Sequence, residues 1–368
     1  MVGERAPTGI LAMMGVASLL AGCAAGPPVE GPSITAAQAR AEIDRSIPRA
    51  VSDRSGWAAD LYAGFTALAI EPSRDNICAV VAVIQQESGF HVDPVVPGLG
   101  VIAWREIDAR AERAGVPQLL LHSLLQLKSS TGRTYGERID RARTEKELSD
   151  IYEDFIGAVP LGQPLFADRN PIRTRGPMQV NVAFAEQYAA LKTYPYPVRV
   201  SIADEVFTRR GSLYFGIAHL LDYPAAYDRY LYRFADYNAG QYASRNAAFQ
   251  SAVSSASGIA LASDGALLPH GAAIRTGDTE LALRAMAGRL NLSESAIHSS
   301  LEQARTKGFE LTPLYRRVFE LADQSAARPL PHELVPHIQL HGPKLTRSLT
   351  TAWYANRVEE RFERCLTR

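Results

Sequence analysis

The sequence carries no net charge and very little cysteine. Lys plus Arg and Asp plus Glu each number 39 among 368 residues, and only three residues are cysteine. No polybasic block occurs, so nucleic acid and acidic lipid surfaces are not expected as partners. Any substrate must therefore be selected by a shaped groove, because no global field is available to attract it.

The apolar stretch near the start of the chain, Ile10–Leu20, is too short to span a membrane as a mature helix. With the weakly basic Arg5 before it, the stretch is typical of an export signal. Leu20-Ala21-Gly22-Cys23 follows and resembles the lipobox of bacterial lipoproteins. The resemblance implies that residues 1–22 are a signal peptide and that Cys23 becomes the N-terminus after acylation, for example by palmitate. An ordinary cleavable signal with an accidental cysteine is the alternative.

The residues that follow Cys23 indicate a tether and a location. Residues 23–34 are rich in Pro and Gly, which is typical of a linker. No Asp follows Cys23 directly, where it would retain a lipoprotein in the inner membrane. We therefore expect an outer-membrane lipid anchor on the periplasmic face, in which several acyl chains make the attachment stable.

The other two cysteines lie far apart in the chain, at Cys78 and Cys365. The periplasm is oxidising, so the two can form a disulfide that pins the C-terminus against the helix around Cys78. Two separate buried thiols are the alternative, because spacing alone does not show geometry.

Helical patterns dominate the chain, and the alternation typical of strands is rare, so we expect a mainly α fold. The most informative segment is Pro72–Ser88, in which every residue from Ile77 to Ile84 is apolar. Ser73 or Asp75 can cap its start, and Gly89 is placed as the glycine that follows a helix.

Glu87 lies at the end of this helix, on the same face as Val80, Val83 and Ile84. Burial and the negative end of the helix both disfavour a charged carboxyl, so we expect its pKa to be raised. A general acid that works near neutral pH requires such a pKa. The alternative is a glutamate that bends out to water at a frayed helix end.

Further helices are expected along the whole chain, one of them after a capping box at Thr144–Glu147. The Ser/Ala/Gly-rich stretch Ser251–Gly271 reads as a loop, and Arg328–Pro343 as extended chain. The expected helices are Thr35–Arg45, Trp57–Ala69, Ala103–Ala114, Gln118–Lys128, Leu148–Val159, Pro177–Lys192, Ser201–Tyr223, Ala225–Tyr242, Thr279–Leu290, Ser293–Lys307, Leu314–Ser325 and Thr346–Cys365.

Three short motifs follow one another in a fixed order. They are Glu87-Ser88, Gly176-Pro177-Met178-Gln179 and Tyr237-Asn238-Ala239-Gly240, with a helical Gly216–Leu221 between the second and third. In this order, behind a lipobox, they resemble the SLT-type lytic transglycosylases, lysozyme-like all-α enzymes that cleave peptidoglycan glycan strands. The chain is more similar still to an uncharacterised family of bacterial lipoproteins with this signature.

The resemblance implies a role for each motif residue. Glu87 would be the only catalytic acid/base, with Ser88 supporting the site beside it. Three further residues would bind sugar: Met178 and Gln179 would line the groove, and Tyr237 would close over or stack on a ring. Asn238 would bind an acetamido group or hold Glu87 in place.

The sequence also departs from the family pattern. Pro177 replaces a leucine, His219 stands where a tyrosine is common, and Gln241 replaces a proline. The 92 positions from Glu87 to Gln179 replace a short loop. The insertion bears on substrate scope more than on reaction type.

The resemblance also leads to an expected domain organisation. We expect a lysozyme-like catalytic domain over residues 35–250, with a helical insertion at about 90–171. A C-terminal helical extension would cover residues 251–368. The insertion would form one wall or lid of the groove, or would block it.

One carboxyl suffices for a lytic transglycosylase, whereas ordinary glycosidases need two. It protonates the glycosidic oxygen and then takes a proton from the muramoyl C6 hydroxyl, which attacks C1 of its own ring. Candidate second carboxylates, for a hydrolase, are Asp93, Asp204 and Asp236, although solvated surface roles suit them better. The histidines show no metal-like spacing, so no metal or cofactor is expected.

We therefore expect a peptidoglycan lytic transglycosylase that forms 1,6-anhydroMurNAc at the MurNAc–GlcNAc bond. The alternative is a catalytically inactive lipoprotein that only binds peptidoglycan. A helix-turn-helix pattern over Leu283–Gly308 is common in helical proteins, and the export signal argues against DNA as its ligand. A run of aromatic residues offers either a sugar-stacking platform or a helix core: Tyr223, Tyr227, Tyr230, Tyr232, Phe234 and Tyr237.

Overall fold

The computed structural model describes residues 35–159, 169–269, 276–342 and 347–368. The residues from Ala36 to Arg368 form one compact unit. The expected signal peptide, Cys23 and the tether lie outside the described residues. Within the described part the protein is mainly helical, as the sequence predicts, and no helix there has the length and apolarity to cross a membrane.

One hydrophobic cluster gathers helices from both ends of the chain. It contains α3 (Arg74–Glu87), whose residues Ile77–Ile84 are all buried. Its other helices are α1 (Ala36–Ser46), α2 (Arg54–Ala67), α9 (Val182–Leu191), α11 (Arg209–Leu221), α12 (Tyr230–Ala239) and α18 (Thr351–Leu366), and the short α10 (Ile202–Glu205) lies beside α9 and α11.

The boundaries of α3 follow the sequence prediction. The Ser73 side chain caps its start by accepting from the backbone N–H of Asn76. The helix ends at Glu87, and Gly89 has a φ of 59°, the left-handed conformation that suits a glycine just past a helix. Glu87 is therefore held at the last helical position and not in a frayed segment.

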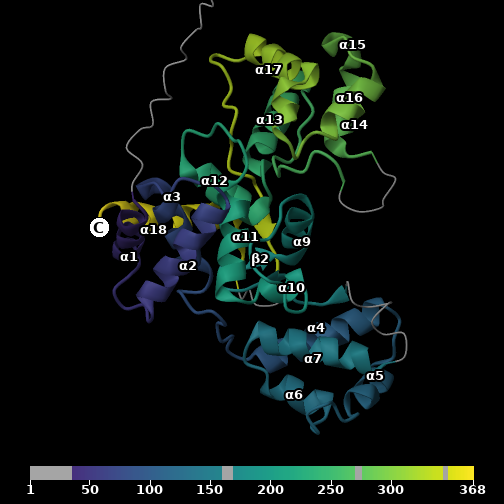
Figure 1. Ribbon diagram of the computed structural model, residues 1–368. Helices are drawn as coiled ribbons and strands as arrows, with labels where there is room; N and C mark the ends of the chain where they lie inside the picture. The colour runs from purple at the N-terminus through teal and green to yellow at the C-terminus, as the bar shows by residue number, and fades with distance from the viewer. Residues whose placement is uncertain (1–34, 160–168, 270–275, 343–346) are drawn as a thin grey trace, which may run out of the picture. The chain divides into compact units, whose positions relative to one another are not determined.

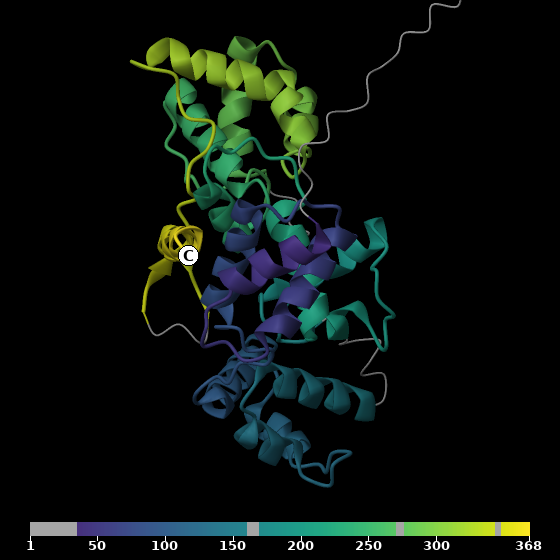
Figure 2. The same ribbon diagram turned by 60° about the vertical axis from the view of Figure 1, so that its left-hand side comes forward.

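The C-terminal helix α18 packs along α3, as Figure 1 shows and Figure 2 repeats from a second direction. A disulfide joins Cys78 of α3 to Cys365 of α18, so the pairing left open by the sequence is present in the structure. Near the other end of both helices, Glu87 contacts Tyr354. Residue numbers rise along one helix while they fall along the other, so the two helices are antiparallel.

The insertion between Phe90 and Pro171 is mainly helical over its described residues, as expected, and has its own small hydrophobic cluster. Capping boxes begin two of its helices, at Thr134–Glu137 and at the expected Thr144–Glu147. Its helices are α4 (Leu99–Arg113), α5 (Gln118–Leu125), α6 (Tyr135–Arg141) and α7 (Glu145–Ala158).

A third cluster contains most of the remaining helices and corrects one expectation. We expect a loop over Ser251–Gly271, but residues 251–257 form the end of helix α13 (Ala243–Ser257), while the described residues 258–269 form no helix or strand. In this part of α13, Ala252 and Ala256 are buried, whereas Ser255 is exposed. The others are α14 (Asp278–Ala285), α15 (Ala287–Leu290), α16 (Glu294–Leu301), η2 (Lys307–Leu311) and α17 (Pro313–Ser325).

The clusters divide differently from the expected domains. Helix α13 spans position 250, and α18, expected in the extension, lies in the same cluster as α3. The stretch before α18 contributes a short antiparallel hairpin of β3 (Gln339–Leu340) and β4 (Leu349–Thr350).

The second motif forms a hairpin turn, which corrects the expected helix Pro177–Lys192. Strands β1 (Thr174–Arg175) and β2 (Val180–Asn181) pair antiparallel around Gly176–Gln179. Gly176 and Gln179 both have positive φ, at 71° and 51°, so the turn conformation excludes a helical start at Pro177. The helix begins only at Val182, after an Asn181 cap.

Candidate functional site

Glu87 and Tyr354 form the centre of the candidate site. The Tyr354 hydroxyl donates to Oε1 of Glu87 at 2.5 Å. Tyr354 is only 5 % exposed, whereas Glu87 is half-buried. The carboxyl therefore has one oxygen held by a buried donor at the end of an apolar helix.

Tyr237 lies close enough to Glu87 for the charge of Glu87 to affect the pKa of the Tyr237 hydroxyl. Burial, and then the negative charge of Glu87, raises the pKa of the Tyr237 hydroxyl well above its ordinary value. The pKa of Tyr354 is raised for the same two reasons and also by Tyr237. Both hydroxyls therefore remain protonated near neutral pH and act as hydrogen-bond donors. The motif residues Glu87 and Tyr237, 150 positions apart, are thus brought together.

The hairpin turn is tied to this group through Met178. The Tyr237 hydroxyl donates to the Met178 carbonyl at 2.7 Å. The Met178 backbone N–H donates to the Ser212 hydroxyl at 3.0 Å. The Met178 side chain is fully buried against Gly216, where an added Cβ would lie 2.3 Å from its sulfur. Met178 was expected to line a groove, but its side chain packs inside the protein.

Gln179 is held by the insertion and by its own hairpin. Its side-chain oxygen accepts from the Thr174 hydroxyl at 2.9 Å. Its amide nitrogen donates to Glu145 of α7 and to the Gly176 carbonyl, both at 3.3 Å. These bonds account for its side chain without a sugar ligand, and they link the turn to the start of α7.

Ser88 and Asn238 differ in what they contact. The buried Ser88 hydroxyl donates to the Ile84 carbonyl of its own helix at 3.2 Å. Exposed Asn238 accepts from the Thr351 hydroxyl at 2.9 Å. Asn238 is therefore connected to the first turn of α18, the turn that also carries Tyr354.

Two of the positions at which the sequence departs from the transglycosylase pattern, His219 and Gln241, contact each other. The His219 ring lies between Phe184 and Tyr237, with centroids 4.5 and 4.9 Å away. Burial lowers the pKa of His219 to about 4, so the ring is neutral at physiological pH. Gln241 donates to the His219 carbonyl at 2.9 Å. Two of the departures thus contact each other and form part of the packing around Tyr237.

The three candidate second carboxylates have roles elsewhere. Asp204 accepts from Ser201 at the start of α10. Asp93 is exposed and interacts with Thr144 and Lys146 at the start of α7. Asp236, expected at a solvated surface, is instead 1 % exposed, which corrects that expectation.

Asp236 holds the turn between α12 and α13. One of its oxygens accepts from the hydroxyls of Tyr223 and Tyr227, at 3.0 and 2.8 Å, and from the Tyr242 backbone N–H at 2.9 Å. The other accepts from the Ser244 N–H at 2.6 Å. Burial nevertheless raises the pKa of Asp236 to about 6. The hydroxyls of buried Tyr223 and half-buried Tyr227 therefore both bond to Asp236 inside the protein.

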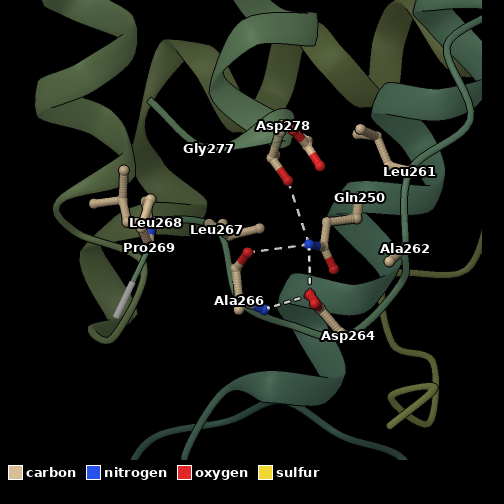
Figure 3. Close-up of a pocket in the computed structure, with 11 residues that line it drawn as sticks. Gln250, Leu261, Ala262, Asp264, Ala266, Leu267, Leu268, Pro269, Gly277 and Asp278 are labelled. Carbon is tan, nitrogen blue, oxygen red and sulfur yellow. Dashed lines mark hydrogen bonds between the residues drawn. The ribbon is translucent and has the colours of Figure 1, made fainter. Parts of the chain in front are cut away.

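A cavity of about 210 Å³ lies in the third cluster, away from the motif residues (Figure 3). The Gln250 amide at its wall donates to the Asp264 carboxylate at 2.9 Å, to the Ala266 carbonyl and to the Thr279 hydroxyl. Its polar groups thus pair with one another. Across residues 35–159, 169–269, 276–342 and 347–368, no group of three or more His, Cys, Asp or Glu side chains could hold a metal ion.

Sequence reasoning missed Tyr354 and Thr351, although it expected the helix that carries them. No motif marks either residue. The one available signal was the possible pairing of Cys78 with Cys365, which places α18 on α3 and brings Tyr354 toward Glu87.

Comparison with known proteins gives one family and one curated relative. The model of the family "Protein of unknown function (DUF1615)" matches residues 50–368. A relative from Escherichia coli (strain K12), named "Uncharacterized protein YaiW", is 51% identical over 324 residues, which cover 88% of each chain. No solved structure matches the chain.

Proposed function

The chain belongs to the DUF1615 family, and we propose that this member is a peptidoglycan lytic transglycosylase in which Glu87 is the single acid/base. The observation that carries the proposal is the Glu87 carboxyl at the end of an apolar helix, bonded by Tyr354 beside Tyr237. A lysozyme-like fold and an outer-membrane lipid anchor at Cys23 are parts of the same proposal.

The environment of Glu87 suits a group that exchanges a proton. The carboxyl is half-buried and ends a helix whose residues from Ile77 to Ile84 are buried. Oε1 accepts the hydrogen bond of the Tyr354 hydroxyl, which fixes the orientation of the carboxyl. A positioned carboxyl of this kind contributes about 10²–10⁴-fold to a rate.

The reaction needs no second carboxylate. Glu87 would protonate the leaving glycosidic oxygen, and the acetamido group of the same sugar would stabilise the positive charge that develops at C1. The resulting carboxylate would take the proton of the C6 hydroxyl, whose oxygen attacks C1. Closure within one sugar has an intramolecular advantage. Asp93, Asp204 and Asp236 each interact with other groups, which favours this scheme over a two-carboxylate hydrolase.

The test is the product of glycan cleavage. Purified soluble protein without Cys23 is incubated with sacculi, and the released fragments are identified by mass. We expect 1,6-anhydromuropeptides from the wild type and none from Glu87→Gln. Because Gln keeps the shape of the side chain, loss of product with retained folding would assign the proton chemistry to Glu87. Reducing-end products that contain one more water would show a hydrolase instead.

One observation favours a second candidate, a lipoprotein that binds the wall without cleaving it. The Gln179 side chain is bonded to Thr174, Glu145 and Gly176, and Met178 is buried, so two expected groove residues have internal roles. This candidate predicts that the protein sediments with sacculi and releases nothing. Binding would then be the same in the wild type and in Glu87→Gln.

A further inference from the structure

We propose that Tyr354 is a positioning residue for Glu87, and that the C-terminal helix α18 is therefore part of the candidate catalytic site. The catalytic consequence rests on the function proposed above. The positioning itself does not, because it is a property of the contact and can be measured without a substrate.

The first turn of α18 contacts two of the sequence motifs. Tyr354 donates to Glu87 of the first motif, and Thr351 donates to Asn238 of the third. Residues three apart on a helix share a face, so one face of α18 reaches both partners. Thr351 is fully buried and Tyr354 nearly so, which places both donors inside the protein.

The rest of α18 is fixed firmly enough to hold this turn in place. Ala355 and Val358 are fully buried in the same cluster as α3. The disulfide attaches Cys365 to Cys78, nine residues before Glu87, a distance of about 13.5 Å along α3 at 1.5 Å per residue. Tyr354 thus lies at the end of α18 opposite its covalent attachment, and the helix is held at both ends.

In this hydrogen bond Tyr354 is the donor and Glu87 the acceptor, and this direction suits both protonation states of the carboxyl. A hydroxyl can donate to Oε1 whether the carboxyl is ionised or carries its proton on the other oxygen. The bond therefore keeps the orientation of the carboxyl while Glu87 changes from acid to base. Tyr354 itself keeps its proton, because burial and the adjacent Glu87 raise its pKa.

The experiment measures the titration of Glu87 in the full soluble chain by ¹³C NMR of carboxyl-labelled glutamate, with Glu87→Gln to assign the signal. Tyr354→Phe keeps the ring and removes the donor. A donor to the charged form stabilises that form, so we expect the titration midpoint to rise by about one pH unit. Tyr237→Phe, which loses the bond to the Met178 carbonyl instead, is the matched control and should produce a smaller rise.

A second measurement does not remove the hydroxyl. 3-Fluorotyrosine placed at position 354 should give a ¹⁹F shift that follows the protonation of Glu87, and Glu87→Gln should make that shift independent of pH. A midpoint in Tyr354→Phe equal to the wild-type midpoint, or a ¹⁹F shift that does not respond to Glu87, would overturn the inference.

A measurement of activity distinguishes the proposed function from the positioning role of Tyr354. If both hold, Tyr354→Phe lowers kcat roughly 10- to 100-fold with KM nearly unchanged, since orientation and not binding is lost. If the titration moves as expected but the wild type releases no anhydro product, the proposed function fails while the positioning stands.

Discussion

Removing the disulfide between Cys78 and Cys365 should destabilise the protein strongly, by an amount that the length of the closed loop predicts. The perturbation is the double substitution Cys78→Ala and Cys365→Ala. Both sulfurs are buried, so alanine leaves the packed helices α3 and α18 in contact. The main change is the loss of a covalent link between residues 287 positions apart.

The number of residues between the two cysteines sets the expected loss of stability. In the chain-entropy description, closing a loop of 287 residues disfavours the unfolded state by about 5.7 kcal/mol at 25 °C. Measured disulfides typically contribute about 2–4 kcal/mol, because the unfolded chain is more compact than the description assumes. We therefore expect the free energy of unfolding to fall by about 4 kcal/mol in the double variant.

The assay is urea unfolding of four samples, the wild type and the double variant, each with and without dithiothreitol. Reductant should lower the wild-type midpoint to that of the variant and leave the variant unchanged. Two reactive thiols in unfolded, non-reduced wild type would refute the bridge itself. A free energy of unfolding of the oxidised wild type that lies within about 0.5 kcal/mol of that of the variant would refute the entropic argument.

Two further predictions concern the packing around the site. Gly216→Ala should cost about 1–3 kcal/mol in thermal unfolding, because its Cβ would meet Met178, whereas Gly288→Ala, with open space around it, should cost nothing. The pKa of Asp236 in the folded protein, about 6, exceeds its ordinary value of 3.8. Between these two pH values the folded state therefore binds more protons than the unfolded state. The wild type should therefore lose stability relative to Asp236→Asn as pH rises from about 4 to about 6, and a difference in Tm that stays constant over this window would contradict the shift.

Local signals in the sequence predicted the two ends of α3 correctly, whereas the expected helices Ser201–Tyr223 and Ala225–Tyr242 are divided or shorter in the structure, as α10, α11 and α12. Ser73 and Gly89 mark the two ends of α3, and both act there as predicted. The capping box at Thr144–Glu147 is also confirmed at the start of α7. Caps work because they satisfy backbone groups within one turn, so a single sequence contains the information.

Predictions of secondary structure were wrong where tertiary packing overrides the local preference of the sequence. Pro177 is acceptable at the start of a helix, but the positive φ values of Gly176 and Gln179 make the segment a turn. That turn is fixed by tertiary contact, since a Cβ on Gly176 would lie 2.1 Å from the Val206 carbonyl oxygen. Helix α13 was missed because residues Ala243–Gln250 are all buried, so its first two turns have no exposed polar face that would give a helical period.

The partners of the site residues were less predictable than the helices. The expectation that Glu87 and Tyr237 approach each other came from motif order, and the structure brings them together. The contact with Tyr354 joins residues 267 positions apart and has no local signature. Only long-range pairing, of which the disulfide is the one covalent case here, could have revealed it.

The structure also changes what the motifs mean. Gly216, Met178 and Tyr237 form one packed unit, in which the glycine makes room for the methionine and the tyrosine bonds its carbonyl. These residues would be needed for the fold even in a protein without activity, so their presence alone is weak support for catalysis. Glu87 is different, because a half-buried carboxyl contributes little to such packing and yet is held by a buried tyrosine from the far end of the chain. The pair Glu87–Tyr354, and not the number of motif residues that match, therefore supports the proposed chemistry.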